Sequence, residues 1–248
     1  IPDHVAVIGD YAFNHCPFTA IVLPDTIKRI GFSSFSSCNN LRNVTIPDSV
    51  TEICARAFEN CGSLQSITIP DSVEKIGFAA FRICSSLMTI DLPKNLKVLD
   101  RSTFSYCSSL EELSLPPYIE RIGNDAIKEC TSLRHLSIPS SIKEIEPDAF
   151  NGCSNINISI EPEGRSLRGR YYSKDGALFI RFKRSNRVAL IVGHSLVQSK
   201  ACIIPEGVSE IKNHAFENCL NLREIILPDS MQVIEPYAFS GCDSMTIA

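Results

Sequence analysis

The sequence predicts an α/β repeat solenoid, a right-handed coil of 23-residue units with a parallel β-sheet on one face and short turns or single helical turns on the other. Three regularities predict it: a proline recurs every 23 residues, a phenylalanine stands eleven residues after it, and a cysteine stands fourteen residues after it. Self-similarity at a fixed period of this length is the signature of a stacked repeat array.

The repeat can be followed along almost the whole chain. The prolines are Pro2, Pro24, Pro47, Pro70, Pro93, Pro116, Pro139, Pro162, Pro205 and Pro228. The cysteines are Cys16, Cys38, Cys61, Cys84, Cys107, Cys130, Cys153, Cys219 and Cys242. The aromatic position holds Phe13, Phe35, Phe58, Phe81, Phe104, Phe150, Phe216 and Phe239, with Ile127 in one unit. The unit that starts at Pro162 is irregular, because Gly176 replaces its cysteine.

One unit, residues 41–63, shows why the elements form. Alternation over 44–46 predicts a strand with one face buried, and Pro47 ends it because proline has no N–H for a ladder. A second short extended piece over 50–53 then leads into a compact turn around 57–60. The predicted inward set is Leu41, Val44, Ile46, Val50, Ile53, Phe58 and Cys61, with Ala57 beside the ring. Each unit must stack on its neighbours to bury that face.

Composition sets the broad class of protein. The 248 residues are 44% hydrophobic and 21% charged, with a net charge of −4, which fits a packed array and gives no indication of nucleic-acid binding. We expect one continuous solenoid domain with three parts: seven repeats over 1–160, an irregular basic segment over 161–203, and the last repeats over 204–248. No apolar run could span a bilayer, and no signal peptide starts the chain. Both ends lie inside a repeat, so we expect a piece of a longer protein.

The repeated pattern IPDSVxxIGxxAFxxCxxLxx resembles the BspA-type leucine-rich repeat, and the resemblance covers nearly all of the chain apart from 161–203. It implies a curved leucine-rich-repeat solenoid on a secreted or surface-anchored protein of a bacterium or protist. It also implies adhesion to host matrix proteins such as fibronectin or fibrinogen. The family carries no catalytic motif, so the resemblance implies no enzyme activity and no cofactor.

The cysteines are predicted to be structural. Catalysis needs different groups at one point, whereas these thiols repeat along a line, and zinc-site spacings are absent. Disulfides between neighbouring units are an alternative, but eleven is an odd number, and we favour buried free thiols that act as small hydrophobes. Cys202 is expected in the core. Cys54 replaces a glycine of other units and is expected to be exposed and weakly reactive.

Two other rows of side chains are interpreted in the same way. Aspartates follow the proline in several units: Asp3, Asp25, Asp48, Asp71 and Asp229. They could hold a cation such as calcium, but aspartate also favours turns, and we favour solvated turn residues. The five histidines occupy unrelated positions, with no Ser-His-Asp or Cys-His arrangement.

Two surfaces are candidates for binding a partner. The first is the outward face of the predicted sheet, which is small, hydroxylic and mildly acidic; its candidate residues are Asn43, Thr45, Thr68, Asp91, Glu112 and His135. Near the C-terminal end the same positions become more apolar, at Ile203 and Ile226. An ordinary solvated sheet is the alternative interpretation of this face.

The second surface lies in the basic segment 161–203, which has nine basic residues against three acidic ones. Apolar stretches on either side of residues 183–186 predict a hairpin, and Asp175-Gly176 predicts an earlier turn. Its candidate residues are Arg170, Tyr171, Tyr172, Arg181, Lys183, Arg184 and Arg187. They could attract an acidic protein or a sulfated glycan; otherwise the hairpin only joins two arrays.

Three hypotheses for function follow. The first is a non-enzymatic adhesion module at the cell surface, which binds a host or matrix protein. The second is an intracellular interaction scaffold, consistent with free thiols. The third is the targeting arm of a larger enzyme. Direct membrane insertion and nucleic-acid binding are not predicted.

Overall fold

A computed structural model describes residues 1–146, 148–161, 170–182, 185, 187–198 and 201–245. The predicted fold class is confirmed: the chain forms a parallel β-solenoid of about nine turns with about 23 residues per turn. It divides into two compact units. Unit 1 comprises Ile1–Leu133 and Ser141–Phe150, and unit 2 comprises Arg134–Ser140 and Asn151–Ala248.

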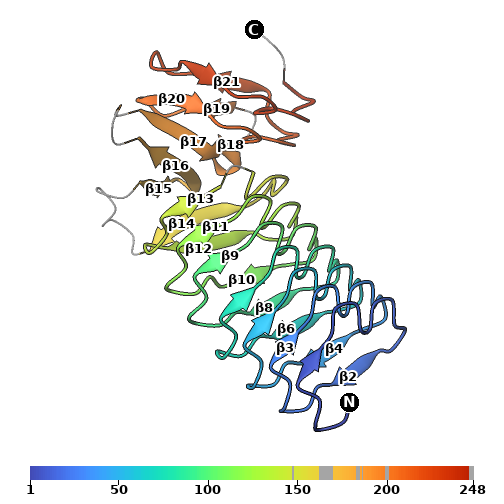
Figure 1. The fold of residues 1–248 in the computed structure, drawn as a ribbon. Coiled ribbons are helices and arrows are strands. Elements are labelled where there is room, and N and C mark those ends of the chain that lie inside the picture. Colours follow the sequence, from blue (N-terminus) through green and yellow to red (C-terminus); the bar gives the residue numbers. More distant parts are fainter. Residues whose placement is uncertain (147, 162–169, 183–184, 186, 199–200, 246–248) are drawn as a thin grey trace. The chain divides into compact units, whose positions relative to one another are not determined.

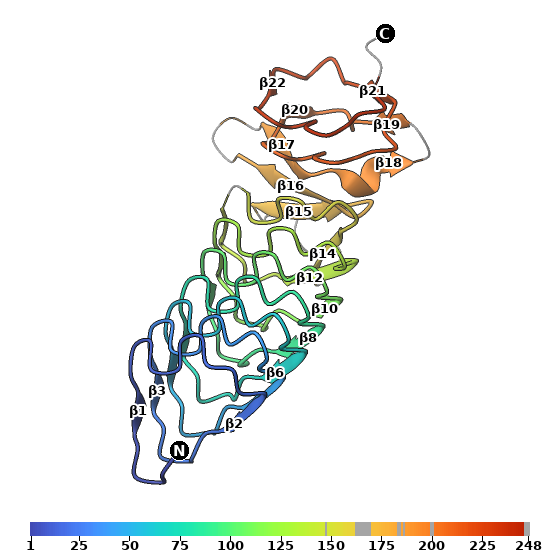
Figure 2. The same ribbon diagram turned by 90° about the vertical axis from the view of Figure 1, so that its right-hand side faces the viewer.

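Each turn of unit 1 contributes one strand before its proline and one strand after it. The strands before the proline, called the first ladder, are β2 (Ala20–Val22), β4 (Asn43–Thr45), β6 (Ser66–Thr68), β8 (Thr89–Asp91) and β10 (Glu112–Leu113). The strands after it, called the second ladder, are β1 (Val7–Ile8), β3 (Arg29–Ile30), β5 (Glu52–Ile53), β7 (Lys75–Ile76), β9 (Val98–Leu99), β11 (Arg121–Ile122) and β13 (Glu144–Ile145). The two ladders lie on opposite sides of the coil of unit 1 (Figure 2).

The register of both ladders is the repeat period itself. Ser66 pairs with Thr89, and Arg29 pairs with Glu52, each 23 residues further along the chain. Successive turns of unit 1 therefore stack in parallel along the coil (Figure 1). Equivalent side chains meet their own equivalents in the next turn, which is why one repeated residue type produces a continuous row.

The inward set predicted from one unit is confirmed. Leu41, Val50, Ile53, Ala57, Phe58 and Cys61 are fully buried, and Val44 and Ile46 are 7% and 5% exposed. The phenylalanines of unit 1 form a stack, with ring centroids 5.2 Å apart between Phe35 and Phe58 and 5.5 Å apart between Phe58 and Phe81. This stack fills the centre of the coil.

The segments that join the two ladders are turns with left-handed residues at two fixed positions. In the turn after β5, Arg56 and Asn60 have φ of 57° and 59°. Alternate amides in this segment bond to the next turn: the N–H of Phe58 donates to the carbonyl of Ala80 at 2.8 Å. The intervening amides close local turns. The predicted "turns or single helical turns" are therefore tight turns in unit 1, where the described residues contain no helix.

Unit 2 contains the irregular segment. Its elements are β12 (His135–Pro139), β14 (Asn157–Glu161), β15 (Tyr171–Lys174), β16 (Ala177–Arg181), β17 (Val188–Val192), the 3-10 helix η2 (His194–Leu196), β18 (Val197–Gln198), β19 (Ala201–Ile203), β20 (Val208–Ile211), β21 (Glu224–Ile226) and β22 (Val233–Ile234). Both predicted reversals are confirmed, because β15 pairs antiparallel with β16 and β16 pairs antiparallel with β17. β17 then pairs in parallel with β20, so this hairpin continues a five-stranded sheet.

Candidate functional site

The cysteine row is a structural element of the coil. All eleven cysteines are free thiols, and all except the half-buried Cys16 are buried. The Sγ of Cys84 donates a hydrogen bond to the carbonyl of Phe58 at 3.1 Å, and Cys61, Cys107 and Cys242 make the equivalent bond. Each thiol thus bonds the backbone of the preceding turn, a role beyond that of a small hydrophobe.

Burial also makes these thiols poor nucleophiles. It raises the pKa of Cys38 to about 11 and the pKa of Cys202 to about 12. Cys202 lies in the core, as expected. The expectation for Cys54 was wrong: it is 8% exposed, and burial raises its pKa, so little reactive thiolate forms at neutral pH. Its glycine equivalents sit beside neighbouring backbone, which indicated a crowded position rather than an open one.

The aspartate row lies at exposed turns. Asp71 pairs with Lys94, with 3.1 Å between the carboxylate and Nζ, and also accepts the backbone N–H of Lys94 at 2.9 Å. These bonds from Lys94 lower the pKa of Asp71. Within the described ranges, no group of three or more His, Cys, Asp or Glu side chains could hold a metal ion.

The outward face of the first ladder in unit 1 is an exposed polar surface. Asn43, Thr45, Thr68, Asp91 and Glu112 are all exposed on it, and Thr68 donates to Asp91 at 3.2 Å. Ser66, Thr89 and Glu112 form one in-register row across β6, β8 and β10. This surface is broad and not hollowed into a pocket by any described cavity, a shape suited to contact with a folded partner.

The remaining outward residues belong to unit 2. His135 is exposed on β12, with its Nε2 3.5 Å from the hydroxyl of Ser159 on β14. On β19 and β21, Ile203 and Ile226 pair in register and are 66% and 48% exposed. The predicted change from polar to apolar outward positions is therefore present.

The basic hairpin places its candidate residues in different settings. Tyr171 is 3% exposed, so its ring faces the interior, and the guanidinium of Arg170 lies 5.6 Å from the centroid of that ring. Arg187 is paired with Glu210 at 3.3 Å. Arg181 lies over the half-buried Tyr172, 5.3 Å from its centroid. Lys183 and Arg184 lie outside the described residues, as do Arg165, Arg168 and Lys200.

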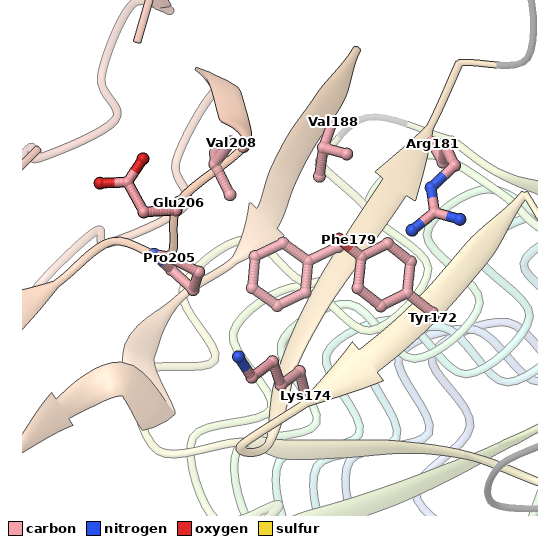
Figure 3. Close-up of a pocket in the computed structure, with 9 residues that line it drawn as sticks. Tyr172, Lys174, Phe179, Arg181, Val188, Pro205, Glu206 and Val208 are labelled. Atoms are coloured by element: carbon pink, nitrogen blue, oxygen red, sulfur yellow. The ribbon is translucent and has the colours of Figure 1, made fainter. Parts of the chain in front are cut away.

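Arg181 and Tyr172 instead line a pocket in unit 2 that sequence reasoning missed (Figure 3). Its volume is about 290 Å³, and β15, β16 and β17 form it together with the segment 205–208. Figure 3 shows the rings of Tyr172 and Phe179 side by side, with Arg181 and Glu206 on opposite sides of the view. The pocket depends on segments more than twenty residues apart, so no local motif could have indicated it.

A row of ion pairs along the second ladder of unit 1 was also missed. Arg29 pairs with Glu52 at 3.3 Å, and Lys75 pairs with the same carboxylate at 3.3 Å. The alternation of charge is interrupted at Val98, beside a groove of about 760 Å³, and resumes where Arg121 pairs with Glu146. The available signal was opposite charges 23 residues apart.

Comparisons with known proteins support the assignment of the repeat. The profile of the BspA type leucine rich repeat region matches in six copies, over residues 6–117, 34–157, 97–174 and 195–248. No curated protein matches the chain. Within the described residues, no helix is long and apolar enough to cross a membrane.

Solved structures of bacterial repeat proteins are similar to the chain. A leucine rich cell surface protein of Faecalibacterium prausnitzii is 26% identical with a TM-score of 0.67; the match covers 97% of this chain and 63% of that protein. The T. pallidum leucine-rich repeat protein is 26% identical with a TM-score of 0.51, over 97% of this chain and 82% of that one. A Bacteroides ovatus leucine-rich repeat protein, at 24% identity and a TM-score of 0.54 over 98% and 76%, shares the fold. The chain belongs to the BspA-type leucine-rich repeat family.

Proposed function

We propose that this chain is a protein-interaction module of a cell-surface protein, and that it binds a host or matrix protein through the outward face of the first ladder in unit 1. Leucine-rich repeat proteins of this type generally bind proteins and are generally non-catalytic. The similar F. prausnitzii protein is described as a cell surface protein, and this chain spans 63% of its length.

The observation that carries the proposal is the exposed in-register row of polar side chains on β6, β8 and β10. These side chains lie on a backbone that is rigidly hydrogen-bonded on both sides, so ordering them on binding costs little backbone entropy. They are short and polar, which favours a broad contact with many weak hydrogen bonds over a single deep anchor.

The test uses two matched double variants. Ser66→Lys with Thr89→Lys places two long charged side chains on the outward face, at residues that are exposed and paired in register. Ser85→Lys with Ser108→Lys makes the same change on exposed residues of two neighbouring turn segments, also 23 residues apart. Binding to a panel of matrix proteins such as fibronectin and fibrinogen, and to sulfated glycans, is measured for both.

We expect the face variant to weaken binding to a matrix protein at least about tenfold, because the bulky side chains prevent close contact. The turn variant should bind like the parent. Equal losses in both variants, or loss of binding only when Arg181 and Arg187 are changed to Ser, would move the contact away from this face. Absence of binding to every panel member would contradict the adhesion proposal.

An intracellular scaffold of the same fold is a second candidate, because eleven free thiols fit a reducing compartment. Burial protects ten of those thiols from oxidants, so the free thiols are also compatible with the cell surface. Labelling of intact producing cells with a membrane-impermeant reagent separates the two: labelled chain supports the surface, and labelling only after lysis supports the scaffold.

A further inference from the structure

The pocket of unit 2 has a chemistry that the outward face lacks. Its inner wall is apolar and aromatic: Phe179 and Val208 are 1% and 2% exposed, and the half-buried Val188 and Pro205 continue the wall. Tyr172 stacks on Phe179 with centroids 5.2 Å apart and ring planes 12° apart. Stacking fixes both rings, so the wall is formed before any ligand arrives.

Two cations belong to this pocket, and neither has an acidic partner among the described residues. Lys174 is exposed, and Arg181 is positioned over the ring of Tyr172. The neighbouring cations of the same sheet differ, because Arg187 and Lys212 are both paired with Glu210. The guanidinium of Arg181 therefore keeps donors available for a bound anion, in an orientation set by the tyrosine ring.

A carboxylate lies on the other side of the pocket. Glu206 is exposed and faces away from Arg181 across the pocket (Figure 3). The adjoining Gly207 has φ of +86°, and a Cβ built there would have no atom within 4 Å, so this side is open. A carboxylate in this position accepts hydrogen bonds from hydroxyl groups and repels a second negative charge.

Together these features describe a ligand with one negative charge, several hydroxyl groups and an apolar ring face. A volume of about 290 Å³ is at the small end of ligand pockets, which leaves room for one ring. An acidic peptide side chain supplies the charge but neither the hydroxyls for Glu206 nor the flat face for the aromatic wall. A densely sulfated chain would bring its further charges against Glu206.

We propose that the pocket between β15, β16 and the segment 205–208 binds a single carboxylated sugar unit, such as the uronic acid residue of a glycan. The sugar carboxylate binds Lys174 and Arg181, a hydroxyl donates to Glu206, and the C–H face of the ring packs on the aromatic wall. This site is independent of the outward face of unit 1, so either proposal can fail without the other.

The experiment is titration of the whole chain with glucuronate, followed by calorimetry and by saturation-transfer NMR, with glucose and a capped glutamate as comparison ligands. We expect glucuronate to bind at least about tenfold more tightly than glucose, because glucose lacks the charge. We expect capped glutamate to bind at least as weakly as glucose. Equal binding of glucose and glucuronate, tighter binding of capped glutamate, or no binding of glucuronate at millimolar concentration would overturn the proposal.

Variants place the ligand. Lys174→Gln and Arg181→Gln should each weaken glucuronate about tenfold. Lys28→Gln, at an exposed lysine of unit 1, should change nothing. Urea unfolding of Arg181→Gln checks that the hairpin is retained; Lys174 is exposed, so its variant keeps the test valid if Arg181→Gln unfolds.

Glu206→Gln decides between a sugar and a plain anion. If Glu206 accepts a sugar hydroxyl, glucuronate binding falls several-fold, because a charged acceptor is replaced by a neutral one. If the pocket only attracts negative charge, removal of this carboxylate strengthens binding. The second result would overturn the assignment of a sugar.

Discussion

The turns of unit 1 and the hairpin of unit 2 solve the same packing problem in different ways. In unit 1, Phe58, Phe81 and Phe104 each pack against their own equivalents, so every contact occurs several times. In unit 2, Phe179 instead packs against Tyr172 from an antiparallel neighbour. Repetition stabilises the coil but makes every turn alike, whereas the hairpin creates contacts that occur once and a pocket that occurs once.

The largest expected effect tests the repeated core. Phe81 is fully buried between Phe58 and Phe104, with centroids 5.5 Å and 5.8 Å away. Phe81→Ala should lower the free energy of unfolding by about 3–5 kcal/mol, because it opens a cavity in a row that cannot close around it. Urea unfolding measures the change.

Phe81→Ile is the matched control, since Ile127 fills the equivalent place in another turn and is fully buried there. It should cost much less than the alanine variant. Unchanged stability of Phe81→Ala would contradict the assignment of this row as the core of the coil.

The next effect is a dependence on pH that both units should share. Burial raises the pKa of Cys38 to about 11 and the pKa of Cys202 and Cys219 to about 12. Unfolded thiols ionise near pH 8.5. The folded state therefore holds protons that the unfolded state releases, so stability is complete below pH 8.5 and falls as the pH rises toward 11.

Urea midpoints at pH 7.5 and 10.5, under reducing conditions, measure this fall. Cys38→Ala should show a shallower decline than the parent, which separates the thiols from lysines and tyrosines that also titrate in this range. A parent whose midpoint is the same at both pH values would show that the thiols are not buried as described.

A third prediction compares the ion pairs of the two units. In unit 2, Lys212 Nζ lies 2.5 Å from Glu210 and 2.6 Å from Glu235, and the Glu210 side chain is only 9% exposed. Lys212→Met should lower the free energy of unfolding by about 2 kcal/mol, because it leaves desolvated carboxylates with fewer partners.

The matched change in unit 1 is Lys143→Met. Lys143 pairs with Glu120 at 2.8 Å, but both side chains are well exposed, so we expect no measurable change in the urea midpoint. Equal losses in the two variants would mean that burial does not distinguish the two networks.

The smallest prediction concerns the left-handed turn positions. Ile83 has φ of 61°, a conformation that β-branched residues rarely adopt, whereas Asn60 and Asn218 occupy the equivalent place in other turns. Ile83→Asn should raise the free energy of unfolding by up to about 1 kcal/mol. The reverse change, Gly241→Ala at φ of 71°, should lower it, and opposite signs in the urea midpoints are the required result.

The sequence predicted the regular part of the fold well because one period controls it. Val44 and Ile46 were placed inward from alternation and from Pro47, and the hairpin was placed from its turn residues; the structure confirms both. The left-handed positions could not be found in this way, because Ser33, Arg56 and Ala79 share a backbone conformation but no side-chain chemistry.

The candidate sites were predicted less completely. The outward residues followed directly from alternation, so Asn43 and Glu112 are exposed as expected. The fate of the basic side chains did not, because it depends on neighbours brought in by the fold: Glu210 pairs with Arg187, while Arg181 joins Tyr172 in the pocket. Charge counted along a segment does not distinguish a paired cation from an available one.

The bond from each buried thiol to the preceding turn has a consequence for how such arrays evolve. Cys84 donates to the carbonyl of Phe58, and Cys107 donates to that of Phe81, so every unit carries both a donor and an acceptor. A duplicated 23-residue unit therefore bonds to the copies before and after it without any compensating substitution. Tandem duplication and deletion can change the number of units in the gene while each junction remains the same.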